Sequence, residues 1–122
     1  MADEGLFTLA EARAVLAELR PALDELVRLR ADAAELSAAV RGGPPTALGG
    51  VPEGKAAEAR LDELMTEIQS HGIELKGFAP LLLDFPSTLG GVPVLLCWLE
   101  GDQGLEWYHR SDLGFVGRRR LP

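Results

Sequence analysis

Residues 81–118, LLLDFPSTLGGVPVLLCWLEGDQGLEWYHRSDLGFVGR, decide how this chain is expected to fold. Three short apolar runs in it, at 81–85, 92–99 and 105–109, each carry a polar group that a purely structural strand does not need. Glycine and proline bound these runs, and residues 100–104 have the composition and length of a hairpin turn. We therefore expect antiparallel strands here, with the last two paired through that turn.

Residues 8–41, upstream of these strands, have the pattern of one long amphipathic helix. Thr8 and Glu11 form a capping box, in which each side chain accepts a hydrogen bond from the other residue's amide. Apolar residues then recur at spacings of three and four from Leu9 to Val40, as in a coiled-coil seam. Pro21 lies inside this pattern and removes one helical hydrogen bond. We expect a bend at Pro21, with a break into two helices as the alternative.

The expected fold class is α+β in a single domain over residues 1–122. Residues 42–53, rich in glycine and proline, predict a flexible loop. Residues 54–71 predict a second amphipathic helix, which stops at Gly72. The two helices would form a long antiparallel hairpin of coiled-coil type. A small antiparallel β-meander and a C-terminal loop follow over residues 73–118.

Composition and charge exclude several classes of function. The chain has 122 residues, 47% of them hydrophobic, and a net charge of −7, most of it in residues 1–72. Nucleic acids and anionic membranes would repel such a surface. The single cysteine excludes an internal disulfide, and no apolar run is long enough to span a membrane. We expect a cytoplasmic protein that binds neither nucleic acid nor membrane.

Several motifs along the chain resemble a bacterial family, the one catalogued as domain of unknown function 2203. The motifs that carry the resemblance are Thr8-Leu9-Ala10-Glu11-Ala12, Leu19-Arg20-Pro21, Glu74-Leu75-Lys76, Leu83-Asp84-Phe85-Pro86, Leu96-Cys97-Trp98, Tyr108-His109 and Gly114-Phe115-Val116-Gly117-Arg118. The chain departs from the family pattern at residues 77–80, 105–107 and 119–120. The resemblance implies a similar fold and carries no activity with it.

Asp84 and His109 are the first candidate pair for chemistry. An ionised carboxylate among the leucines of residues 81–83 is costly to bury unless it is paired. If Asp84 faces His109, the two make an acid–base couple, because histidine changes its charge near neutral pH. The alternative is that Asp84 caps a turn at residues 86–88.

A divalent metal site is the second possibility. His109 and Asp112 lie three residues apart, and with Asp84 or Glu106 they supply nitrogen and oxygen ligands. The alternative is a hydrogen-bonded structural histidine. His71, the other histidine, falls at the end of the second helix, where its charge suits the helix dipole.

A small polar pocket on the C-terminal sheet is the third candidate. Arg118 ends a glycine-punctuated loop and would hold a small anionic ligand, with Glu106, Tyr108 and Trp98 nearby. The alternative is that Phe115 of this loop fills the core while Arg118 pairs with a helix acid. Arg119 and Arg120 extend this basic end as a solvated tail.

Cys97 lies in an apolar run and is expected to behave as a small buried hydrophobe. It would act as a nucleophile only if His109 lay beside it on the adjacent strand.

Two functional hypotheses follow. The first is a homo-oligomeric interaction or small-ligand-binding module, which self-associates through the helical hairpin and carries the polar pocket on its sheet. The second is a small acid–base enzyme or divalent-metal-binding protein that uses His109 with Asp84 or Asp112. The sequence indicates no specific cofactor apart from that metal.

Overall fold

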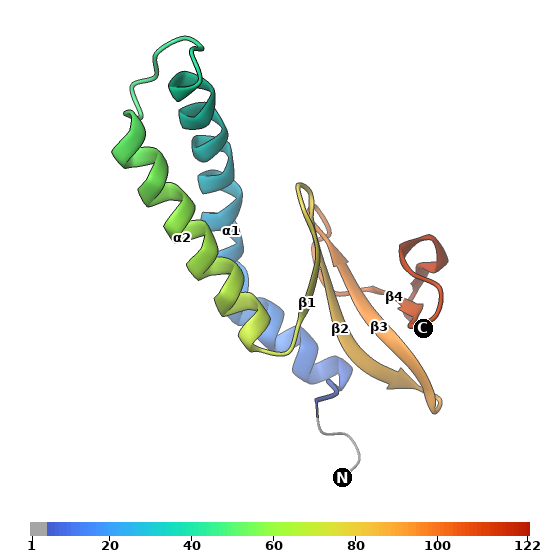
Figure 1. Ribbon diagram of the computed structural model, residues 1–122. Helices are drawn as coiled ribbons and strands as arrows, with labels where there is room; N and C mark the ends of the chain where they lie inside the picture. The colour runs from blue at the N-terminus through green and yellow to red at the C-terminus, as the bar shows by residue number, and fades with distance from the viewer. Residues whose placement is uncertain (1–4) are drawn as a thin grey trace. The chain divides into compact units, whose positions relative to one another are not determined.

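The computed structural model describes residues 5–122 and contains two long helices packed together, followed by a five-stranded antiparallel sheet (Figure 1). The elements are α1 (Leu9–Val40), α2 (Val51–Ser70), β1 (Glu74–Phe78), β2 (Leu81–Leu89), β3 (Val92–Leu99), β4 (Trp107–Arg110), the 3-10 helix η1 (Phe115–Gly117) and β5 (Arg119–Arg120). This confirms the predicted α+β class.

The chain divides into two compact units, which are described separately. The helical unit comprises Leu19–Glu67, and the sheet unit comprises the residues up to Glu18 together with Ile68–Pro122. Within residues 5–122, no helix combines the length and the apolar character that crossing a membrane requires.

The helical unit is built from two antiparallel helices around one apolar seam. α1 continues through Pro21, so the alternative of two separate helices is wrong. The side chains buried in the seam are those spaced by threes and fours in the sequence: Leu19, Ala22, Leu23, Leu26, Leu36, Ala57, Leu61 and Leu64. On the outside, the Arg60 guanidinium of α2 contacts the Glu25 carboxylate of α1, with Nε and Oε2 2.7 Å apart.

The connection between the helices is shorter than the sequence predicts, because α2 already begins at Val51. The Gly50 amide donates a hydrogen bond of 2.8 Å to Glu53 Oε1, which satisfies one of the free donors at the start of α2. Thr46, in the middle of the connection, donates its hydroxyl hydrogen to the Glu35 carboxylate of α1. The predicted glycine- and proline-rich loop is therefore tied to the hairpin by at least one side chain.

The sheet has the simple order β1-β2-β3-β4-β5, with every neighbouring pair antiparallel. β2 and β3 form an uninterrupted ladder from Leu89↔Val92 to Leu82↔Leu99. Gly90 and Gly91 make the turn between them, with positive φ of 56° and 80°, as a two-residue hairpin turn demands. β4 pairs with β3 after the predicted turn. β5 is a strand that the sequence analysis took for a solvated tail.

Both faces of β2 and β3 are covered, which explains why their sequences are nearly continuous apolar runs. One face carries Leu83 and Phe85, and the Phe85 ring meets the edge of Phe7 at 5.3 Å between ring centroids. The other face carries Asp84 and Cys97. The sheet unit's core is completed by Ala12, Leu16, Ile68, Ile73, Leu81, Val94, Leu96, Trp98 and Leu105.

Candidate functional site

Three neighbouring strands bring Asp84, Cys97 and His109 together. Asp84 of β2 lies directly opposite Cys97 of β3, and Cys97 lies opposite Trp107 of β4. His109 is two residues beyond Trp107, so its side chain lies on the same face of the sheet. All three side chains are buried, and one oxygen, sulfur or nitrogen atom of each lies within 4.8 Å of the others.

The orientation of the His109 ring follows from its two contacts. Nδ1 is 3.0 Å from the Arg110 carbonyl oxygen, and Nε2 is 3.2 Å from Asp84 Oδ2. A carbonyl oxygen only accepts, so Nδ1 carries a hydrogen and donates it. Nε2 then either carries a second proton or presents a lone pair to the carboxylate. In both cases the contact between His109 and Asp84 requires a positive ion between the two side chains. That ion is either a proton or a metal ion.

Asp84 has one oxygen in contact and one without a partner. Oδ2 accepts from Lys76 Nζ at 3.3 Å as well as facing His109. Oδ1 is buried and has no hydrogen-bond partner among residues 5–122. The alternative role of Asp84 as a turn cap is wrong, because residues 86–88 continue β2 instead of forming a turn.

Cys97 is held as a thiol. Burial raises the pKa of Cys97 to about 12, and the negative charge of Asp84 also raises it. A nucleophilic cysteine requires a lowered pKa and a base in contact with it. The two ring nitrogens of His109 are instead directed at Arg110 O and Asp84 Oδ2. This geometry does not support a cysteine nucleophile.

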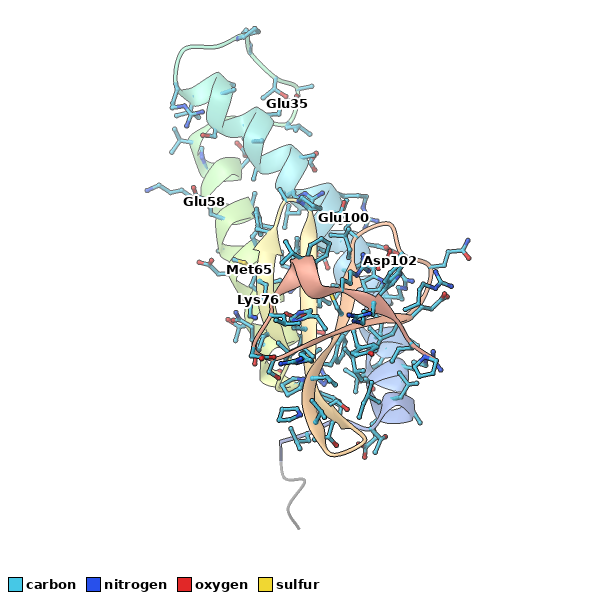
Figure 2. All side chains as sticks on the ribbon, turned by 90° about the vertical axis from the view of Figure 1, so that its right-hand side faces the viewer. Glu35, Glu58, Met65, Lys76, Glu100 and Asp102 are labelled. Atoms are coloured by element: carbon cyan, nitrogen blue, oxygen red, sulfur yellow. The ribbon has the colours of Figure 1, made fainter. Side chains whose placement is uncertain are left out.

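Lys76, which is labelled in Figure 2, contacts the cluster from β1, the edge strand of the sheet. The register of β1 against β2 shifts between Leu75 and Gly77, so Lys76 has no partner in the ladder. The Lys76 ammonium contacts Glu74 at 3.2 Å and Asp84 at 3.3 Å. Burial lowers the pKa of Lys76, but the hydrogen bonds to Glu74 and Asp84 outweigh it and raise the pKa overall.

Arg118 lies near the cluster but has an acidic partner of its own. Its guanidinium donates to Asp102, in the turn between β3 and β4, and stacks 4.6 Å from the centre of the Trp107 ring. The alternative in which Phe115 fills the core is wrong, because this side chain is exposed. The alternative also paired Arg118 with an acid of a helix. Arg118 instead pairs with Asp102, an acid of the sheet unit.

Asp112, one of the predicted partners of His109, is not part of the cluster. Its carboxylate is exposed and accepts from the Arg110 guanidinium at 2.6 Å, which lowers the pKa of Asp112. Among residues 5–122, the group of metal-ligating side chains is Asp84, Cys97 and His109.

The three other residues predicted to line a ligand pocket also lie outside the cluster. Glu106 is paired with Arg120 at 2.9 Å. Tyr108 points to the opposite face of β4 from His109. Trp98 points to the opposite face of β3 from Cys97, and its Nε1 donates to the Asp102 carbonyl at 3.0 Å.

The sequence analysis missed Cys97 as a ligand and did not consider Lys76. The two-residue turn at Gly90 and Gly91 contains the missing signal. Counting back from it pairs residue 89 with 92, and therefore places Asp84 opposite Cys97. For Lys76, the only signal is that it lies two residues after Glu74 in a short edge strand, so the two side chains are expected on the same face. The bulge that turns the Lys76 side chain toward Asp84 cannot be predicted from the sequence.

The three ligand types of the cluster and the one distance between its oxygen and nitrogen atoms suit a divalent transition metal. A carboxylate, a thiolate and an imidazole are the three ligand types that zinc takes in proteins. In a tetrahedral site, bonds of roughly 2.0–2.1 Å put an oxygen and a nitrogen ligand about 3.3 Å apart. The Asp84 Oδ2 to His109 Nε2 distance is 3.2 Å. The Nδ1 hydrogen bond to a backbone carbonyl is the outer contact that metal-binding histidines typically make.

The fold and the cluster together define a small α+β protein whose buried aspartate, cysteine and histidine could form a site. Over residues 5–121 the chain matches the family described as "Uncharacterized conserved protein (DUF2203)", and it belongs to that family. This confirms the resemblance seen in the sequence. Comparison with curated proteins and with solved structures found no match.

Proposed function

We propose that this protein is a divalent-metal-binding module and that Asp84, Cys97 and His109 are the ligands. The observation that carries the proposal is the fixed His109 ring, whose Nδ1 hydrogen is donated to Arg110 O at 3.0 Å. With Nδ1 donating, a Nε2 without a proton would point its lone pair at an acidic oxygen, a contact that a proton or a metal ion between the two atoms makes favourable. The unpartnered Asp84 Oδ1 is a further buried acceptor that the ion would satisfy.

The same observations support metal binding over acid–base catalysis. The side chains of Asp84 and His109 are each only 2% exposed, which leaves no room for a substrate to contact them. A metal ion needs no such surface, because it enters the cluster and takes its ligands from three sides. Metal binding would also release the Cys97 proton, as thiolate ligation requires. Three protein ligands leave one position for a water or a further ligand.

The test is metal content and cobalt spectroscopy on protein purified without chelator. We expect one zinc or similar ion per chain by elemental analysis. Replacement by Co²⁺ should produce a sulfur-to-cobalt charge-transfer band, because Cys97 is the single thiol of the chain. Cys97→Ala and His109→Ala should abolish the band and the stoichiometric metal.

The chain offers matched controls for each ligand type. His71, the other histidine, follows the end of α2, and Asp112 is an exposed acid. His71→Ala and Asp112→Asn should bind metal as the wild type does. Circular dichroism of every variant separates loss of metal from loss of fold. Wild-type protein that is folded and takes up neither zinc nor cobalt would refute the proposal, whatever the variants do.

Self-association of the helical unit is a second candidate function, with another copy of this chain as the partner. Two helices bury a single seam, which is less than a stable layer of helices normally buries. Val40 and Val51, at the loop end of the hairpin, are 50% and 52% exposed. Hollows of about 310 and 200 Å³ lie on this end, and Leu36 contributes to both. A second hairpin would cover these aliphatic side chains and complete a bundle.

Light scattering at micromolar concentration tests this association. We expect a mass of at least twice 13.1 kDa, and a shift toward 13.1 kDa in Val51→Glu. Thr66→Glu adds the same negative charge to α2 at an exposed residue that lines neither hollow, and it should leave the mass unchanged. A folded wild-type monomer of 13.1 kDa would refute self-association and leave the metal proposal untouched.

A further inference from the structure

We infer that Lys76 is a built-in competitor for the metal, whose ammonium must leave Asp84 for Glu74 before an ion can bind. This inference rests on the proposed metal site and concerns its regulation. Lys76 Nζ and His109 Nε2 contact the same oxygen, Asp84 Oδ2, at 3.3 and 3.2 Å. A divalent ion bound to that oxygen would stand beside the ammonium, and the two positive charges would repel each other.

The position of Lys76 suits it to control access. The Lys76 side chain is 45% exposed, whereas the Asp84 side chain that it contacts is 2% exposed. Lys76 therefore lies at the boundary between solvent and the buried cluster. An ion that approaches Asp84 from this edge of the sheet must pass the ammonium, and movement of one long exposed side chain opens the way.

Glu74 gives the displaced ammonium a second partner. Glu74 lies directly opposite Asp84 in the ladder of β1 and β2, and its carboxylate is 3.2 Å from Lys76 Nζ. The lysine therefore contacts one exposed and one buried carboxylate at once. When a metal ion binds the buried carboxylate of Asp84, the exposed carboxylate of Glu74 remains as a partner for Lys76. Glu74 thus lowers the cost of moving Lys76 aside.

The backbone of β1 is built to direct Lys76 in this way. The register shift between Leu75 and Gly77 leaves Lys76 as the extra residue of a bulge, which re-aims its side chain. Gly77 permits the bulge, because a Cβ there would lie 2.9 Å from the Pro80 carbonyl oxygen and 3.2 Å from Leu82 Cβ.

Opposite effects of two substitutions test the inference. Lys76→Met removes the competitor, so we expect Zn²⁺ to bind about tenfold more tightly and to associate faster. Glu74→Gln leaves Lys76 with Asp84 alone, so we expect binding to weaken by about threefold. The measurements are competition against a chromophoric chelator for affinity and stopped-flow mixing for the association rate.

Lys55 provides the matched control, because it and Lys76 are the two lysines of the chain. Lys55→Met makes the same charge change in α2 and should alter zinc affinity by less than about twofold, as a general surface charge does. If Lys76→Met binds zinc more weakly than the wild type, or equally well, the competitor role is refuted while the metal site stands. If the wild type binds no metal, both proposals fail together.

A second measurement does not depend on affinity. Without metal, Lys76→Met should melt at a lower temperature than the wild type, because Asp84 has lost a cation. With saturating zinc, the order should reverse, because the ion replaces that cation without competition. A variant that melts lower under both conditions would show a purely structural lysine and refute the inference.

Discussion

The two units of this protein each pair a carboxylate with a nitrogen-bearing side chain, but one pair is exposed and the other is buried. In the helical unit, Arg60 and Glu25 meet with side chains 43% and 36% exposed. In the sheet unit, His109 and Asp84 meet with side chains 2% exposed. Water solvates both side chains of the first pair whether or not they are in contact, so the contact contributes little to the free energy of unfolding. The second pair has lost that solvation, and removing one partner would leave the other as a buried polar group without its contact.

The difference teaches where to look for function in such a chain. The exposed contact is well made, since the hydrogen bond from Arg60 lowers the pKa of Glu25. A well-formed ion pair at the surface nevertheless does not indicate a function, because charged surface residues are needed for solubility alone. A buried group of a carboxylate, a thiol and an imidazole is different, because well-packed apolar residues of similar size would often serve stability as well or better.

The largest effect should come from breaking the buried pair. Asp84→Ala leaves His109 without its acidic partner and removes one contact of Lys76. We expect the free energy of unfolding of metal-free protein to fall by about 3 kcal/mol, measured by urea denaturation. Asp112→Ala, at an exposed acid paired with Arg110, is the control and should leave the midpoint nearly unchanged. Equal effects of the two substitutions would remove the distinction between buried and exposed acids.

The pH dependence of stability sharpens the same comparison through Cys97. Burial raises the pKa of this thiol from 9.0 to about 12, so the native state keeps its proton after the unfolded state has lost it. The stability present below pH 9 should therefore be lost as pH rises toward 12, with Cys97 contributing about 1.4 kcal/mol per pH unit. The free energy of unfolding, measured by denaturation at a series of pH values between 8 and 11, should fall more steeply with pH for the wild type than for Cys97→Ala. Parallel curves would contradict the raised pKa.

An intermediate effect should follow from Arg118, which is neither fully buried nor freely exposed. Arg118→Ala removes the contact with Asp102 and the stacking on Trp107. We expect the protein to lose about 2 kcal/mol of stability and its tryptophan fluorescence to change, since the cation leaves the ring. Arg119→Ala, at the next residue, which is exposed, should do neither. A silent Arg118→Ala would mean that the stacking contributes nothing.

The smallest effect should come from Arg60. Arg60→Met removes the guanidinium but keeps an unbranched side chain of high helix propensity in α2. We expect a denaturation midpoint within experimental error of the wild type, and none of the salt sensitivity that the exposed pair confers. A loss as large as that of Asp84→Ala would mean that exposure does not separate the two pairs.

Much of the fold could be predicted from the sequence because local spacing determines it. The seam from Leu9 to Val40 specifies a helix of this length, and α1 runs through Pro21 because its apolar residues continue on both sides. The turn at residues 100–104 was enough to pair β3 with β4. β5 was missed because two arginines look like a solvated tail, although they pair with β4 beside Trp107.

The candidate site was predictable only in part because it depends on register across three strands. Asp84 and His109 were paired in the sequence analysis on the ground that a buried acid needs a cation, and the structure places them 3.2 Å apart. Asp112 was a false partner, since nearness in sequence does not bring it onto the sheet. Cys97 joins the cluster through a ladder that starts five residues away from Asp84, at Leu89.

The two-residue turn at Gly90 and Gly91 has a consequence for how this chain tolerates insertions. One extra residue in that turn would offset β3 by one position, and every side chain beyond it would exchange faces. Cys97 would then leave the face of Asp84, although every residue of the cluster would still be present. An extra residue in the glycine- and proline-rich connection between the helices would not exchange the faces of any strand. Relatives that keep this cluster should therefore vary in length between the helices and hold the turn at two residues.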